Sequence, residues 1–107
     1  VDPHKRQSIL IEEKIEGMEF SCITITDYKT NTLLPLPPTE IILEKGAHFF
    51  DYEQKYMPGK GHKRTPHLCS EHIIKRIQDT CVQAMRALDI TNISRIDGFV
   101  TKDERIV

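Results

Sequence analysis

The stretch SEHIIKRIQDTCVQAMRALD, residues 70–89, carries the strongest periodic signal in the chain. Its apolar residues recur every three or four positions with charged and amide residues between them, as on an amphipathic helix with one buried face. Ser70 is a candidate N-cap, and Glu71 lies where the helix dipole favours negative charge. The stretch therefore predicts a helix over residues 70–89 whose core-facing stripe is Ile73, Ile74, Ile77, Cys81, Ala84, Met85 and Leu88.

Segments rich in β-branched and aromatic residues lie on both sides of this helix. Four of them are typical of strands or extended connections: residues 8–13, 19–26, 32–43 and 93–100. The third contains three prolines, which cannot donate to a sheet ladder, so we expect an edge strand or an extended connection there. After a turn, Ile106 and Val107 begin a further strand, which suggests that a larger protein continues beyond them.

Residues 43–69 show no sustained period and contain several glycines and prolines. Loops longer than about 12 to 15 residues without structure of their own are uncommon in compact domains and are often lids or binding loops. We therefore expect a long lid-like loop here. A plain disordered linker is the alternative.

The composition limits the classes of function. The 107 residues suffice for one small domain, and 15 Lys and Arg balance 16 Asp and Glu to a formal net charge of -1. Such a charge supplies no field for nucleic acid or for an anionic membrane, and no apolar run is long enough to span a bilayer. Three cysteines without a C-x-x-C pair indicate free thiols in a reducing compartment, so we expect a cytoplasmic location.

Arg95 and Asp97 are the residues most easily connected to chemistry. Alternate residues of a strand share one face, so these two side chains should project together, about 6.6 Å apart along the strand. The pair is either a surface ion pair or a phosphate-binding cation beside a Mg²⁺ carboxylate. Glycines and basic residues near residues 59–64 do not form a Walker A loop, and the histidines and Cys69 do not have a zinc-site spacing.

Four motifs appear in an order that resembles the C-terminal ATP-grasp portion of the D-alanine:D-alanine ligase family: EEKIEGMEF at 12–20, LPPTEI at 36–41, FDYEQKY at 50–56 and SRID at 94–97. The resemblance covers nearly the whole chain. It implies an α+β fold in which an antiparallel sheet and one long amphipathic helix packed on it form part of an ATP-grasp fold. Residues 1–107 are then a single partial domain, the C-terminal ATP-grasp subdomain.

The resemblance also assigns roles to residues. It places Glu12, Glu13 and the backbone of Ile15 at the adenine, and Glu19 at the ribose hydroxyls. Lys55 corresponds to a loop lysine that reaches the phosphates, and Tyr56 to a loop residue that helps to close the lid. Arg95 corresponds to the arginine that stabilises the transferring phosphoryl group, and Asp97 to one Mg²⁺ carboxylate. A second metal carboxylate is expected beyond Val107.

The implied reaction joins two D-alanines through an acyl phosphate at the expense of ATP, for peptidoglycan precursor synthesis. ATP and Mg²⁺ are the implied cofactors, with Mn²⁺ as an alternative metal, and D-alanine is the implied substrate. We expect the isolated chain to be inactive without the missing parts of the polypeptide, and the full-length enzyme to be compatible with a homodimer. The alternatives are another ATP-grasp carboxylate–amine ligase and a non-catalytic nucleotide-binding or interaction module.

Overall fold

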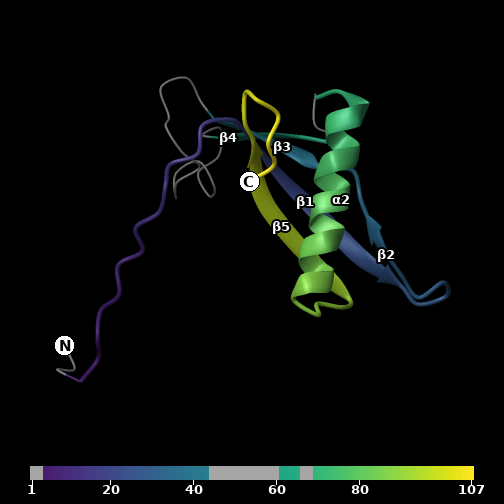
Figure 1. Cartoon of the computed structure of the whole chain (residues 1–107), viewed down its shortest axis with the longest axis horizontal. Helices are drawn as coiled ribbons and strands as arrows, with labels where there is room; N and C mark the ends of the chain where they lie inside the picture. Colours follow the sequence, from purple (N-terminus) through teal and green to yellow (C-terminus); the bar gives the residue numbers. More distant parts are fainter. Residues whose placement is uncertain (1–3, 44–60, 66–68) are drawn as a thin grey trace.

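The computed structural model describes residues 4–43, 61–65 and 69–107. Within these residues the order of elements is β1 (Met18–Asp27), β2 (Thr32–Pro35), β3 (Thr39–Leu43), β4 (Gly61–Arg64), α2 (Glu71–Ala87) and β5 (Ile93–Val100). All the strand pairings are antiparallel, and α2 lies across one face of the sheet (Figure 1). The predicted α+β arrangement is confirmed.

The long strand β1 organises the sheet. It pairs along its length with β5, from Met18 opposite Val100 to Ile25 opposite Ile93. Its other edge is shared, because β3 pairs with residues 19–21 and β2 with residues 24–27. Between β2 and β3 the chain passes through two consecutive prolines, which have no N–H to offer a ladder. The extended stretch expected over residues 32–43 is therefore two short strands separated by this break.

The helix forms where its sequence pattern predicts. The Ser70 side chain accepts a hydrogen bond from the backbone N–H of Ile73 at 3.3 Å, which caps the first turn. Ile73, Ile77, Cys81 and Met85 are buried as predicted. Leu88 is not part of the core and is 70% exposed, because the helix ends at Ala87 and the chain turns away from the stripe.

The core fills the space between α2 and the sheet. Phe20, Cys22 and Val100 from the strands pack in one cluster with Ile73, Ile77 and Cys81 from the helix. Cys22 and Cys81 are both buried, and the burial of Cys81 agrees with its place on the predicted helix stripe.

Close packing also explains Gly98. A Cβ atom at Gly98 would lie 2.7 Å from the Phe20 ring, so only a glycine lets that ring cross β5.

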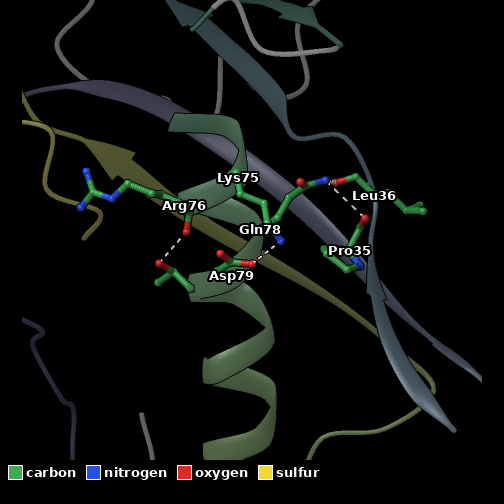
Figure 2. Close-up of polar contacts among 7 residues, drawn as sticks. Pro35, Leu36, Lys75, Arg76, Gln78 and Asp79 are labelled. Carbon is green, nitrogen blue, oxygen red and sulfur yellow. Dashed lines mark hydrogen bonds and ion pairs between the residues drawn. The ribbon is translucent and has the colours of Figure 1, made fainter. Parts of the chain in front are cut away.

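Gln78 connects the helix to the break between β2 and β3. Its side-chain amide donates to the Leu36 carbonyl oxygen at 3.1 Å and approaches the Pro35 carbonyl oxygen at 3.4 Å (Figure 2). These two carbonyl groups lie at the end of β2, where the pairing of β1 changes from β2 to β3. The Gln78 amide therefore donates to carbonyl oxygens that the pairing of strands does not satisfy. On the same helix, Lys75 pairs with Asp79 at 2.9 Å (Figure 2).

Two expectations from the sequence are corrected. Residues 8–13 are extended but form no strand, and Ile9, Leu10 and Ile11 are 81–90% exposed, because the described residues offer this segment no partner to complete a ladder. The region 43–69 is not wholly a loop, since β4 pairs with β3 within it.

The end of the chain agrees with the expected strand. Ile106 bridges to Val100, and Val107 exchanges backbone hydrogen bonds of 2.8 and 3.0 Å with Phe99. Among the described residues, no helix is both long and apolar enough to cross a membrane.

Replacing Ile77 by alanine should test the core. The side chain is fully buried between α2 and β1, so Ile77→Ala should lower the free energy of unfolding by about 2 to 5 kcal/mol. Leu88→Ala, on the same helix stripe but exposed, should change it by less than about 0.5 kcal/mol. Urea unfolding followed by circular dichroism measures both values. Equal losses would contradict the described helix packing.

Candidate functional site

A cleft of about 900 Å³ lies where the chain enters the sheet. Residues 12–19 form one side of it, residues 40–42 of β3 another, and residues 97–99 of β5 a third, with Val107 at the edge. The cleft therefore gathers segments that lie at the two ends and in the middle of the sequence. Pairing of β1 with β3 and β5 brings them together.

Most of the site residues predicted from the sequence meet at this cleft. Glu12, Glu13, Ile15, Glu19 and Asp97 all line it. Arg95 does not line it, but it pairs with Asp97, which does. The two predicted loop residues, Lys55 and Tyr56, lie outside the described residues.

Arg95 and Asp97 form the expected pair on β5. Arg95 Nε lies 3.2 Å from Asp97 Oδ1, and Arg95 Nη2 donates to Oδ2 at 3.2 Å. Their side chains are 67% and 53% exposed, on the sheet face that α2 leaves open. An ion pair this exposed contributes little to stability, so both groups remain available to a ligand.

Ser21 is a site residue that the sequence analysis missed. The Ser21 hydroxyl donates to Asp97 Oδ1 at 2.7 Å, from the position directly opposite on β1. Oδ1 thus has two partners, the Ser21 hydroxyl and Arg95 Nε, while Oδ2 accepts from Arg95 Nη2. Alternation along residues 19–26 could have placed Ser21 on the same face as Glu19, but only the register with β5 identifies its partner.

The open face presents its polar groups in a fixed order. Glu19 lies opposite Phe99, Ser21 opposite Asp97, and Ile23 opposite Arg95. Each step of two residues advances about 6.6 to 6.8 Å along the strand, so the rows of Glu19 and Arg95 are about 13 Å apart. A carboxylate, a second carboxylate and a guanidinium therefore follow one another along one line of the sheet.

The charge of the cleft is mainly negative. Lys14 is the basic residue among the described lining residues. Six acidic residues line the cleft: Glu12, Glu13, Glu16, Glu19, Glu40 and Asp97. Within residues 4–43, 61–65 and 69–107, no three His, Cys, Asp or Glu side chains are grouped to hold a metal by themselves. Asp97 fits Mg²⁺ as a single oxygen ligand, since this ion commonly takes one or two protein carboxylates and completes its shell with phosphate and water.

The pair of β3 and β4 lies at one side of the cleft. The two strands pair from Glu40 opposite Arg64 to Leu43 opposite Gly61. Arg64 pairs with Glu40 at 2.6 Å across the hairpin, and the Thr39 and Thr65 hydroxyls are hydrogen-bonded to each other. Glu40 and Ile41 line the cleft, so β3 forms part of its wall.

The thiols are structural rather than part of the cleft. A hydrogen bond between the buried Cys22 and Cys81 side chains lowers the pKa of Cys22 and raises that of Cys81. Burial raises the pKa of Cys69. At the turn before the last residues, the Thr101 hydroxyl lowers the pKa of Asp103 by donating a hydrogen bond to it.

The chain resembles known proteins over almost all of its length. A family model described as "D-ala D-ala ligase C-terminus" matches residues 3–107. A D-alanine--D-alanine ligase of Leptospira interrogans is 34% identical over 98 residues, which are 90% of this chain and 27% of that relative. One of Bifidobacterium animalis is 30% identical over 100 residues, 89% of this chain and 26% of the relative.

Solved structures agree with these matches. The VanG D-Ala:D-Ser ligase of Enterococcus faecalis is 33% identical with a TM-score of 0.70, over 89% of this chain and 26% of that one. The D-alanine-D-alanine ligase of Coxiella burnetii, at 22% identity and a TM-score of 0.64 over 90% of this chain and 22% of its own, shares the fold. The chain thus spans about a quarter of the length of the relatives it matches.

Proposed function

The chain belongs to the D-ala D-ala ligase C-terminus family, and on this premise we propose that it supplies one wall of the ATP and Mg²⁺ cleft of a ligase that joins two D-alanines. The observation that carries the proposal is the line of Glu19, Asp97 and Arg95 along the open face, beside the cleft. An elongated ligand with hydroxyls at one end and phosphates at the other matches this order of acceptors and donors.

The nucleoside end of ATP is assigned to residues 12–19. The carboxylates of Glu12 and Glu13 and the backbone of Ile15 would contact the adenine, and Glu19 would accept hydrogen bonds from the ribose hydroxyls. All four residues line the same cleft. Carboxylate oxygens act only as acceptors when ionised, which suits hydroxyl and amino donors of a nucleoside and repels phosphate.

Asp97 is the residue that would hold Mg²⁺, oriented by Ser21. Oδ1 accepts from the Ser21 hydroxyl and lies 3.2 Å from Arg95 Nε, and Oδ2 accepts from Arg95 Nη2, so a bound ion would share the carboxylate with the guanidinium. The bound ion supplies Lewis-acid stabilisation to the phosphates and offsets their charge beside an acidic cleft. Such a counter-ion is needed here because the six carboxylates of the lining would otherwise oppose a polyphosphate.

Arg95 is assigned to the phosphoryl group that is transferred. In the proposed reaction a carboxylate oxygen of one D-alanine attacks the γ-phosphorus of ATP and ADP leaves. The amine of the second D-alanine then attacks the carbonyl carbon of the acyl phosphate, and phosphate leaves. Negative charge grows at each step, and a guanidinium fixed on a strand stabilises it without reorganising. Lys55 would add a second cation, and Tyr56 would help to exclude water.

D-serine is a second candidate for the substrate that supplies the amine. The chain is 34% identical to a D-alanine--D-alanine ligase and 33% identical to a D-Ala:D-Ser ligase, so similarity alone favours neither amine. Profiling the full-length protein with D-alanine, D-serine and other amino acids as the acceptor decides between them. The cytoplasmic location and the homodimer of the full-length protein remain predictions.

Arg95→Ala in the full-length protein should lower kcat by about 10² to 10³ because one fixed cation is lost from the transition state. Lys55→Ala should act in the same direction. Arg105→Ala is the matched control: this arginine is also 67% exposed and also pairs with an aspartate, Asp103, at 3.2 Å. A coupled assay of phosphate release with D-alanine measures all three. Equal kinetics for Arg95→Ala and Arg105→Ala would remove Arg95 from the site.

Ser21→Ala should raise the Mg²⁺ concentration that gives half-maximal turnover by about 10-fold, since partners that orient a metal ligand typically contribute 10- to 100-fold to metal affinity. Thr30→Ala, which removes an exposed hydroxyl from the turn after β1, serves as the control. Titration of Mg²⁺ at saturating ATP provides the measurement. A purely structural role for Ser21 would leave the Mg²⁺ dependence unchanged.

A further inference from the structure

The turn that follows β5 has the form of a three-residue hairpin loop, and Thr101 and Arg105 close it. The backbone N–H of Thr101 donates to the Arg105 carbonyl oxygen at 3.0 Å, and the Arg105 N–H donates to the Thr101 hydroxyl at 3.0 Å. The residues between them, 102–104, are here called the hairpin loop. They reverse the chain and bring Ile106 and Val107 back beside β5.

Glu104 occupies the position of the hairpin loop that favours glycine. The last residue of a three-residue hairpin loop commonly adopts the left-handed conformation, which glycine accepts without a steric penalty. Glu104 has a φ of 61°, so it adopts this conformation although it carries a side chain. A side chain at such a φ strains the backbone, and the conformation persists only where neighbouring groups hold it.

Arg76 provides such a contact from outside the hairpin loop. Its Nη1 atom donates to the Glu104 carbonyl oxygen at 2.5 Å, from the second turn of α2. In Figure 2 the Arg76 side chain extends away from Gln78, on the side of the helix opposite to Pro35 and Leu36. A charged donor makes a stronger hydrogen bond than a neutral one, and this donor fixes the direction of the Glu104 carbonyl group. The contact therefore favours the left-handed conformation over others that would turn the carbonyl away.

The hairpin loop sets the place of Val107. The backbones of Val107 and Phe99 exchange hydrogen bonds of 2.8 and 3.0 Å, and Val107 lines the cleft beside Gly98 and Phe99. The fit is close, since a Cβ atom on Gly98 would lie 2.6 Å from the Val107 carbonyl oxygen. A loop conformation that moved this register by one residue would turn the Val107 side chain to the other face of the sheet.

These contacts link the helix to the wall of the cleft. We propose that Arg76 is a positioning residue of the cleft: by binding the Glu104 carbonyl it holds the hairpin loop in its left-handed form and so keeps Val107 at the wall. The identity of the ligand as ATP rests on the proposed function, whereas the hold on the loop does not. Arg76 itself does not line the cleft, so its loss should weaken nucleotide binding and spare the phosphoryl transfer assigned to Arg95.

Arg76→Ala in the full-length protein should raise KM for ATP by about 2- to 10-fold, the range expected for the loss of one hydrogen bond, and should leave kcat within about 2-fold. Arg76→Lys keeps a charged donor and should have a smaller effect. Arg86→Ala is the matched control, because it removes the same charge from an exposed position in the last turn of α2. Phosphate release at varied ATP measures all three. A lower kcat with unchanged KM, or equal effects of Arg76→Ala and Arg86→Ala, would overturn the positioning role.

Glu104→Gly separates the hold on the loop from a general effect of charge on the helix. Glycine adopts the left-handed conformation without help, so adding Arg76→Ala to Glu104→Gly should change KM for ATP by less than about 2-fold. Glu104→Ala is the control, because it removes the same carboxylate but keeps a Cβ atom. Adding Arg76→Ala to Glu104→Ala should still raise KM. Equal effects of Arg76→Ala in the two backgrounds would show that Arg76 does not act through the loop.

Hydrogen exchange reads the loop without any substrate. The amides of Phe99 and Val107 are bonded to each other's carbonyl oxygens, so in Arg76→Ala they should exchange about 2- to 10-fold faster, while those of residues 77–85 in α2 keep their rates. Unchanged exchange at both amides would overturn the hold on the loop. Absence of turnover by the unsubstituted full-length protein with ATP and D-alanine would instead reject the proposed function, and the exchange rates would still decide whether Arg76 holds the loop.

Discussion

The pairing of β1 with β5 is the constraint on which the rest of the structure depends. Eight consecutive residue pairs, from Met18–Val100 to Ile25–Ile93, fix the register of two strands that lie about 75 residues apart in the sequence. A slip of one residue would turn every side chain of a strand to the other face. Phe20 and Cys22 would then leave the core, and Asp97 would lose Ser21. The core and the candidate site thus depend on the same set of backbone hydrogen bonds.

One face of the sheet carries the buried core, and the other carries the residues of the candidate site. The face under α2 holds the buried cluster of Phe20, Cys22 and Val100, and the Gln78 amide attaches the helix to the break between β2 and β3. That break allows β3 to pair with the first part of β1 and so to present residues 40–42 to the cleft. Among the described residues, the open face carries no comparable buried cluster, and the ion pair of Arg95 and Asp97 is exposed. Substitutions on it can therefore alter binding without unfolding the domain.

Local patterns in the sequence predicted what local interactions determine. The helix expected within residues 70–89, its Ser70 cap and the shared face of Arg95 and Asp97 follow from periodicities of 3.6 and 2. The structure confirms the cap, the shared face and the helix, which runs over Glu71–Ala87. The strand expected over 8–13 failed because a strand needs a partner, which no local pattern reports. The role of Ser21 was missed for the same reason, since its bond to Asp97 spans 76 residues. The roles of Lys55 and Tyr56 came from the family resemblance alone.

The order of groups on the open face gives the cleft a direction. Carboxylates of residues 12–19 lie at one end, Asp97 and Arg95 follow, and the exposed side chains of Ile23 and Ile93 come last. A polyphosphate placed in reverse would bring its charges against the glutamates, where no cation of the described lining other than Lys14 offsets them. With ATP as the proposed ligand, the forward orientation would place the phosphates beside Arg95, whose guanidinium offsets their charge.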